Sequence, residues 1–505
     1  MLGKLKKVTF TLYGSFAKTY KGHGTDKALL GGILGFNTDD IRIRDAFNIA
    51  KSQGLEFSFV IDEETIPDHP NTADILMESS DGTTQFIRGQ SIGGGKVKIV
   101  KIGNIDVDFT GEYSTLIVKQ IDTPGVVAHL TRCLSHEDVN IAFMRLFREA
   151  KGQIAYTIIE SDEQIPDHIL DELKENKNIL GTTVIQCATP EPKTSARKAT
   201  PSHTINKTPG HILSEAPEVT WDFTSGKSLE DLCQKNSLSI SDAMKHRELS
   251  VGLSSHDNID LRLSKILEIM NSSTHDPITC PQKSIGGLIG GEGKKVANSH
   301  LKSLCGPVLT KAISYAMSVL EVNGTMGLIV AAPTAGSSGV LPGCLLAVGE
   351  DFAFTEDKIK SGLLNASALG YIMMRNASVS GAEAGCQAEV GAASAMAASA
   401  LTELFGGTPK MCLTAASLAI SNLLGMVCDP IAGLVESPCQ SRNAIGVSNA
   451  FTCSQLALSG ITHPIPFDEM VEAMYKVGRS LPFELRETAL GGNAGTPTGC
   501  SLCCL

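Results

Sequence analysis

Apolar and polar positions alternate along the N-terminal part of the chain. Residues 9–13, 56–61 and 96–100 follow a period of two, which is typical of β-strands with one buried face. Glycine-rich turns such as 93–95 separate these runs. A helix is expected after the G-H-G-T-D stretch at 22–26, with Thr25 or Asp26 as its N-cap. The pattern predicts an α+β accessory domain over residues 1–110.

Residues 113–187 show a different pattern of apolar and polar positions. The apolar runs predict, in order, a strand at 113–120, a helix at 126–135, strands at 141–147 and 154–160, a helix from about Pro166 and a strand at 178–186. This βαββαβ order predicts a small antiparallel sheet with both helices on one face.

A proline-rich stretch follows and leads into a different kind of sequence. Residues 188–219 contain five prolines among Thr, Ser, Lys and Ala, with little apolar periodicity, so we expect a linker. Residues 220–505 predict a mostly α-helical C-terminal domain. Its segments 391–404 and 413–426 are rich in small residues, which lets helices pack closely.

Composition narrows the classes of protein that are possible. The 505 residues are 42% hydrophobic and 19% charged, with a net charge of −11 and no basic block. A nucleic-acid partner is therefore not expected, because phosphate binding needs a concentrated Lys/Arg surface. Residues 411–428 are uncharged, but their Ala and Ser content favours a buried helix over a membrane span. No secretory signal opens the chain, so we expect a cytoplasmic enzyme of small molecules.

Three of the fourteen cysteines lie at the ends of predicted helices. Cys386 and Cys439 each precede a predicted helix, where the helix dipole favours a thiolate, and Cys428 ends an uncharged helix. The C-x41-C-x10-C spacing differs from the close cysteine pairs of zinc sites. From the residues alone, a metal or cluster site and an inert packed core both stay open.

The turn Asp122-Thr123-Pro124-Gly125 joins the first strand and first helix of the βαββαβ unit. It resembles the D-x-P-G turn of ACT domains, which bind amino acids as regulators. Glycine permits a close approach, and the helix N-terminus behind it can receive a carboxylate. This resemblance implies an ACT-like regulatory domain at 113–187 with Asp122, Pro124 and Gly125 at its effector site, while a plain β–α turn is the alternative.

Longer motifs carry a second resemblance. Residues 428–443 read C-D-P-I-A-G-L-V-E-S-P-C-Q-S-R-N, residues 381–391 read G-A-E-A-G-C-Q-A-E-V-G, and residues 332–343 read A-P-T-A-G-S-S-G-V-L-P-G. With L-Y-G-S-F-A-K-T-Y at 12–20 and the G-H-G-T-D after it, they resemble iron–sulfur L-serine dehydratases. The glycine-rich stretch 284–291 is also similar to this family.

The resemblance implies a function and a cofactor. It implies conversion of L-serine to pyruvate and ammonia, with a [4Fe–4S] cluster held by Cys386, Cys428 and Cys439. Three protein thiolates leave one iron open as a Lewis acid for the serine hydroxyl, whereas four would favour electron transfer. For substrate binding it implies a set of loop and helix residues: Thr334, Gly336, Ser337, Ser338, Gly339, Arg442 and Asn443.

Three features of this site stay open at the level of sequence. The general base is not identified, and His23 and Lys294 are the candidates. A tail cysteine, one of Cys500, Cys503 and Cys504, either approaches the open iron or belongs to a frayed terminus. Family members usually carry an S-S-H-T segment upstream of the position where this chain starts, so either the chain does without that segment and its polar group or the start of the sequence is truncated.

Two other functions compete with the dehydratase. A pyridoxal-phosphate dehydratase would need a Schiff-base lysine beside a phosphate loop, and no lysine has that context here. A catalytically impaired amino-acid-sensing homologue is the other alternative. The expected partners are L-serine and an amino-acid effector, and the expected assembly is a homo-oligomer, with a dimer as its simplest form.

Overall fold

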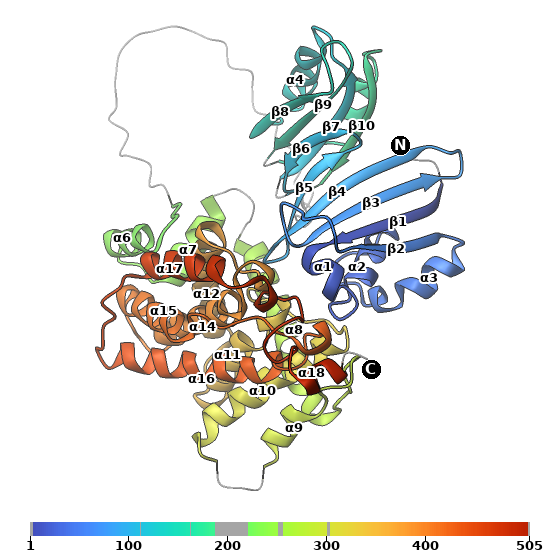
Figure 1. The fold of residues 1–505 in the computed structure, drawn as a ribbon. Helices are drawn as coiled ribbons and strands as arrows, with labels where there is room; N and C mark the ends of the chain where they lie inside the picture. The colour runs from blue at the N-terminus through green and yellow to red at the C-terminus, as the bar shows by residue number, and fades with distance from the viewer. Residues whose placement is uncertain are drawn as a thin grey trace, which may run out of the picture.

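The computed structural model describes residues 4–111, 113–161, 163–186, 221–250, 256–299 and 303–502. Two β-sheets occupy the N-terminal part, and a large helical bundle forms the C-terminal part (Figure 1). This arrangement confirms the β-rich start and the mostly helical C-terminal part predicted from sequence. The expected linker at 188–219 lies outside the described residues.

The first sheet has the strand order β2-β1-β3-β4-β5-β6. Strand β1 pairs parallel with β2 and antiparallel with β3, and the remaining neighbours are antiparallel. The strands are β1 (Leu5–Tyr13), β2 (Glu56–Asp62), β3 (Thr72–Ser79), β4 (Thr84–Gly93), β5 (Lys96–Ile102) and β6 (Ile105–Phe109).

Short helices cover one face of this sheet. They are α1 (Gly14–Thr19), α2 (Thr25–Ile33) and α3 (Ala46–Ser52), with a 3-10 turn η1 (Ile41–Asp45) between the last two. Val8 and Phe10 of β1 are fully buried against Leu30 of α2 and Ala50 of α3. The alternation seen in the sequence therefore marks the buried face of β1.

The N-cap predicted for α2 is wrong. The cap is Gly24, whose φ of 65° is in the left-handed region, and neither Thr25 nor Asp26 caps the helix. The Asp26 carboxylate instead accepts a hydrogen bond from Lys27 N at 2.8 Å. Glycine takes the left-handed conformation without strain, so the chain turns sharply at this residue, directly after His23.

The second sheet is antiparallel, with the order β10-β7-β9-β8. Its elements are β7 (Ser114–Ile121), α4 (Val126–His136), β8 (Phe143–Arg148), β9 (Ile154–Ser161), α5 (Ile169–Leu173) and β10 (Ile179–Ile185). Leu116 and Ile159 of the sheet pack on Leu130 of α4 and Ile169 of α5. The predicted βαββαβ order is confirmed, although α5 begins three residues after Pro166.

The C-terminal part is built around α14 (Ala392–Leu404), whose residues are almost all buried. Alanine and serine along this helix allow neighbouring helices to approach closely on several sides. The other helices are α6 (Gly226–Asn236), α7 (Ile240–Ser250), α8 (His256–Thr279), α9 (Glu292–Ala297), α10 (Gly306–Gly324), α11 (Val340–Asp351), α12 (Glu356–Asn376), α13 (Gly381–Ala384), α15 (Pro409–Leu423), α16 (Cys439–Leu458), α17 (Phe467–Ser480) and α18 (Pro497–Leu502).

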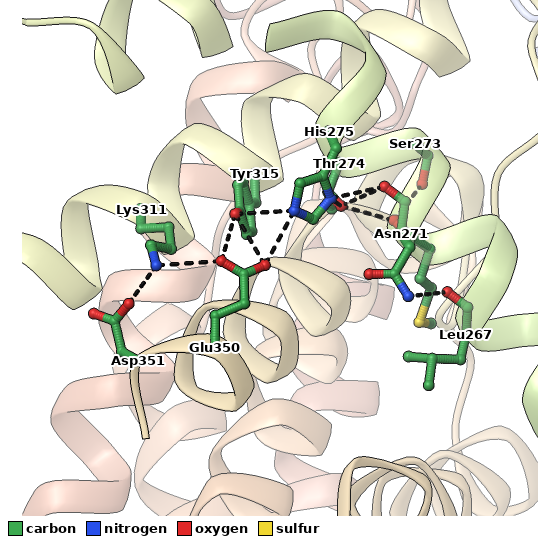
Figure 2. Close-up of polar contacts among 10 residues, drawn as sticks. Leu267, Asn271, Ser273, Thr274, His275, Lys311, Tyr315, Glu350 and Asp351 are labelled. Carbon is green, nitrogen blue, oxygen red and sulfur yellow. Dashed lines mark hydrogen bonds and ion pairs between the residues drawn. The ribbon is translucent and has the colours of Figure 1, made fainter. Parts of the chain in front are cut away.

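A polar network joins α8, α10 and α11 on the outside of this bundle (Figure 2). The Glu350 carboxylate accepts from Tyr315 Oη at 2.8 Å and lies 3.0 Å from His275 Nε2, while Lys311 bridges Glu350 and Asp351. These groups are partly exposed, so the network contributes little to stability by charge alone. It links three helices whose neighbouring segments, around Ile285, Gly324 and Gly336, line the cavity described below.

Only the first part of the uncharged stretch at 411–428 is helical. Helix α15 ends at Leu423, and Cys428 lies beyond it in an extended segment that forms an isolated β-bridge with Arg486. The expectation that Cys428 ends the helix is therefore wrong. Among the described helices, none combines the length and the apolar character that a membrane crossing needs.

Candidate active site

A cavity of about 330 Å³ lies where the first sheet unit meets the helical part. Glycines make this contact close: a Cβ at Gly22 would lie 2.2 Å from Gly433 O, and one at Gly94 would lie 2.6 Å from Met374 Sδ. Both parts of the chain contribute lining residues, and those with reactive or polar side chains include His23, Thr334, Glu389, Cys428, Glu436, Cys439 and Glu487.

Two buried cysteines, Cys428 and Cys439, line this cavity, and a third, Cys386, lies beside Cys428. The sulfurs of Cys386 and Cys428 and a carboxylate oxygen of Glu389 all lie within 4.8 Å of one another. Cys439 begins α16 and lines the same cavity. A hydrogen bond with Cys386, followed by burial, raises the pKa of Cys428 well above its usual range. Burial, followed by the charge of Cys386, does the same for the pKa of Cys439.

Local structure places each thiol. Cys386 precedes a single π-helical turn, η3 (Gln387–Gly391), which leads into α14. Cys428 is held through its backbone, because its N–H donates to Leu485 O at 2.9 Å and its carbonyl accepts from Glu487 N at 2.7 Å. The C-terminal segment after α17 therefore fixes the position of Cys428.

Arg442 faces the sulfurs. Its Nη1 donates to Cys386 Sγ at 3.5 Å and to Val427 O at 2.8 Å, and it lies 2.8 Å from Asp429 Oδ1. A buried guanidinium beside sulfur offsets negative charge on thiolates. The arginine that the resemblance placed at the substrate thus contacts Cys386 and the two residues that flank Cys428.

Two buried carboxylates, Glu389 and Glu487, were missed from the sequence. Glu389 Oε2 lies 3.9 Å from the sulfurs of both Cys386 and Cys428, and its Oε1 accepts from Thr334 Oγ1 at 2.7 Å. Burial, with a contribution from the charge of Glu487, raises the pKa of Glu389 to about 7. Burial also raises the pKa of Glu487 to about 7.

Only one of these carboxylates had a sequence signal. Glu389 is one of two charged residues in the motif at 381–391, and it lies three positions after Cys386. Glu487 lies in the charged string E-L-R-E at 484–487, where nothing distinguishes it from a solvent-facing residue.

Of the two base candidates, His23 lies at the cavity. It lines the cavity wall, and its Nδ1 lies 3.7 Å from Glu487 Oε1. Burial lowers the pKa of His23 to about 4, although the charge of Glu389 opposes this shift. Lys294 lies on α9, where its ammonium donates to Thr279 O at 3.2 Å, and it is not among the described lining residues.

The loop with the A-P-T-A-G-S-S-G motif forms another wall. Thr334, Ala335 and Gly336 line the cavity, and the short 3-10 turn η2 (Ala335–Ser337) begins there. The first backbone N–H groups of such a turn have no partner within the turn. Ser337 and Ser338 are fully buried, and Ser338 Oγ donates to Ala335 O at 2.7 Å.

Asn443 braces this loop from α16. Its Oδ1 accepts from Gly339 N at 3.0 Å, and its Nδ2 donates to Gly336 O at 2.8 Å and to Cys439 O at 2.9 Å. The amide is thus used within the protein, and it couples the loop to a cysteine. Gly339 allows close packing, since a Cβ there would lie 2.2 Å from Ala316 O.

Glu436 organises the glycine-rich stretch 284–291. Its buried carboxylate accepts from Ser284 Oγ at 2.6 Å, Gly286 N at 2.7 Å and Leu288 N at 2.9 Å. Because Glu436 lies three residues before Cys439, the stretch is tied to the cysteine wall of the cavity.

The described part of the tail, up to residue 502, and the second sheet contribute no residue to the cavity lining. Cys500 is exposed on α18, where its thiol donates to Ala494 O at 3.4 Å, and Cys503 and Cys504 lie outside the described residues. In the second sheet, Asp122 Oδ2 accepts from Gly152 N at 3.0 Å and from Arg148 Nη1 at 3.2 Å. Gly125, after Pro124, is the N-cap of α4 with a φ of 89°.

Sequence comparisons agree with this division of the chain. The profile of the serine dehydratase alpha chain matches residues 235–494, and that of the serine dehydratase beta chain matches residues 1–101. The chain belongs to the serine dehydratase family. Its beta-chain part comes first and its alpha-chain part second, within one polypeptide, and the cavity lies between the two.

Individual relatives cover the same two parts. A probable L-serine dehydratase alpha chain of Bacillus subtilis is 44% identical over 280 residues, which are 55% of this chain and 93% of the relative. The probable beta chain of the same organism is 39% identical over 180 residues, 36% of this chain and 81% of the relative. L-serine dehydratase TdcG of Escherichia coli is 35% identical over 289 residues, 55% of this chain and 62% of the relative.

Proposed function

We propose that the protein is an L-serine dehydratase that converts L-serine to pyruvate and ammonia. In this proposal Cys386, Cys428 and Cys439 hold a [4Fe–4S] cluster with one iron free of a protein thiolate. The observation that carries it is that Cys428 and Cys439 line a cavity that also holds His23 and two carboxylates, with the thiol of Cys386 beside Cys428.

The donor set fits such a cluster. Soft thiolate ligands select iron–sulfur centres over hard oxygen-binding cations. Buried thiols beside other acidic groups lose their protons less readily, and the raised pKa values of Cys428 and Cys439 agree with this. Arg442 beside Cys386 offsets part of the remaining negative charge.

The residues around the cavity support an elimination. Such a cluster supplies Lewis-acid assistance to the departure of the serine hydroxyl. In this proposal the neutral imidazole of His23 takes the Cα proton. The N–H groups at the start of η2 suit the substrate carboxylate, and Glu389 suits its ammonium group. The aminoacrylate that forms then tautomerises and hydrolyses in water.

The two alternative functions are a pyridoxal-phosphate dehydratase and an impaired amino-acid sensor. The described lining of the cavity contains no lysine, so a Schiff base of pyridoxal phosphate has no amine there. An impaired sensor is tested directly, because it would take up the cluster without turnover.

A regulatory role for the second sheet is also proposed. Its βαββαβ order, the left-handed Gly125 and the ordered Asp122 turn support an ACT-like module that binds an amino acid. A homodimer and a cytoplasmic location stay predictions.

The deciding experiment is anaerobic reconstitution with iron and sulfide, followed by a pyruvate assay with L-serine. We expect brown absorbance together with pyruvate formation. Cluster uptake without pyruvate would favour the sensor, and pyruvate formation that depends on pyridoxal phosphate would refute the iron–sulfur assignment.

A further inference from the structure

Glu487 occupies an unusual position for an acidic residue. Its side chain is only 13% exposed, and its backbone φ of 59° is in the left-handed region that non-glycine residues rarely adopt. Its N–H donates to Cys428 O at 2.7 Å, and its carbonyl accepts from Ser15 Oγ at 2.9 Å. The residue therefore joins a cysteine of the cavity to the beta-chain part of the protein.

The carboxylate of Glu487 faces one nitrogen of His23. Glu487 Oε1 lies 3.7 Å from Nδ1, whereas Nε2 is buried and has no hydrogen-bond partner among the described residues. In a neutral imidazole one nitrogen carries the proton and the other carries a lone pair. A carboxylate at Nδ1 favours the proton there and leaves the lone pair on Nε2.

We propose that Glu487 is a positioning residue that orients His23 and stabilises the imidazolium formed when Nε2 takes the Cα proton of serine. This inference rests on the proposed function. A distance of 3.7 Å is longer than a hydrogen bond, and such contacts commonly shorten when substrate binds. Burial disfavours a charged imidazole, and the charge of Glu389 opposes that effect. The carboxyl group of Glu487 at Nδ1 is the second acidic group beside His23.

The step balances without an added reactant. The Cα–H bond breaks as Nε2–H forms, the Cβ–O bond breaks as the carbon–carbon double bond forms, and hydroxide leaves. The proton on His23 then passes to that hydroxide, which gives water and returns the neutral imidazole. Glu487 neither gains nor loses a proton in this step.

The test compares Glu487→Gln, which removes the charge but keeps an acceptor, with Glu487→Ala, which removes both. His23→Asn tests the base, and Glu484→Gln is the matched control, since Glu484 is exposed in the same segment. Each reconstituted protein is assayed for kcat, KM, cluster absorbance and the isotope effect on kcat with Cα-deuterated L-serine.

We expect kcat to fall about 10- to 100-fold in Glu487→Gln and further in Glu487→Ala, as removing part of a general-base apparatus does. KM and cluster absorbance should stay within about twofold of the parent, and the isotope effect should increase because proton removal becomes slower. Glu484→Gln should match the parent, and His23→Asn should lose turnover.

Two outcomes distinguish a failure of the role given to Glu487 from a failure of the role given to His23. If His23→Asn is inactive but both Glu487 variants keep the parent kcat and isotope effect, the inference is wrong while the proposed function stands. If His23→Asn keeps full turnover, the assignment of the base itself fails. A failure of Glu487→Ala to fold leaves the decision to Glu487→Gln.

Discussion

Glu436 offers a quantitative test of how the cavity is held together. Its carboxylate accepts three hydrogen bonds from the stretch 284–291, two of them from the backbone N–H groups of Gly286 and Leu288. Glu436→Ala removes all three contacts. The Ser284 hydroxyl keeps a second acceptor, Ile289 O at 3.0 Å, but the two backbone groups lose the only acceptor found for them among the described residues.

The size of the effect follows from those two groups. A hydrogen bond to a charged acceptor contributes about 1.5–3 kcal/mol, so two lost bonds lower the local opening free energy by at least about 3 kcal/mol. Since about 1.4 kcal/mol corresponds to a factor of ten, the amides of Gly286 and Leu288 should exchange about a hundredfold faster.

Hydrogen–deuterium exchange by mass spectrometry measures this directly on peptides that cover 284–291. Glu436→Gln should give an intermediate increase, because its amide keeps one acceptor oxygen. Glu469→Ala, a change of an exposed glutamate on α17, should leave the exchange unchanged. An increase below about threefold in Glu436→Ala would refute the view that this carboxylate orders the stretch.

Three further substitutions and exposure to air test a cluster ligand, the segment that carries His23, the proposed regulatory turn and the open iron. Cys428→Ser should abolish brown absorbance and turnover, whereas the exposed Cys280→Ser should keep both; full activity in the first would remove Cys428 from the ligand set. Gly22→Ala should lower kcat at least about tenfold with the cluster retained. The reason is that its Cβ would lie 2.2 Å from Gly433 O and displace the segment that carries His23. An unchanged kcat would contradict the placement of His23 at the site. Gly125→Val should alter the dependence of rate on L-serine without loss of cluster, since valine is strained at a φ of 89°; identical saturation curves would argue against a regulatory turn. Air exposure should inactivate the reconstituted enzyme, and stable turnover in air would count against an iron without a protein thiolate.

The architecture was largely predictable from patterns of period and composition. Alternation marked β1, and the order of apolar runs predicted the second sheet, because a strand or helix with one buried face must repeat apolar residues at its own period. Helix ends were less predictable. The N-cap of α2 is Gly24, not its polar neighbours, and α15 ends at Leu423, well before Cys428, because tertiary contacts with the C-terminal segment determine the backbone there.

The site was predictable where motifs are contiguous and not where it is assembled across the chain. The motif that begins at Cys428 lines the cavity, and so does His23, which the sequence offered only as one of two candidates for the base. Glu487 was not predictable, because its contact with His23 joins residues more than 460 positions apart. Asn443 was predicted near the substrate, but its amide is used within the protein to brace the 334–339 loop.

The central claim is that one iron of the cluster lacks a protein thiolate and faces the cavity. Mössbauer spectroscopy of the protein reconstituted with 57Fe, recorded with and without L-serine, tests it most directly. We predict that about one quarter of the iron signal shifts when L-serine is added, while the remainder is unchanged. Identical spectra at a saturating L-serine concentration, with pyruvate forming, would contradict the claim.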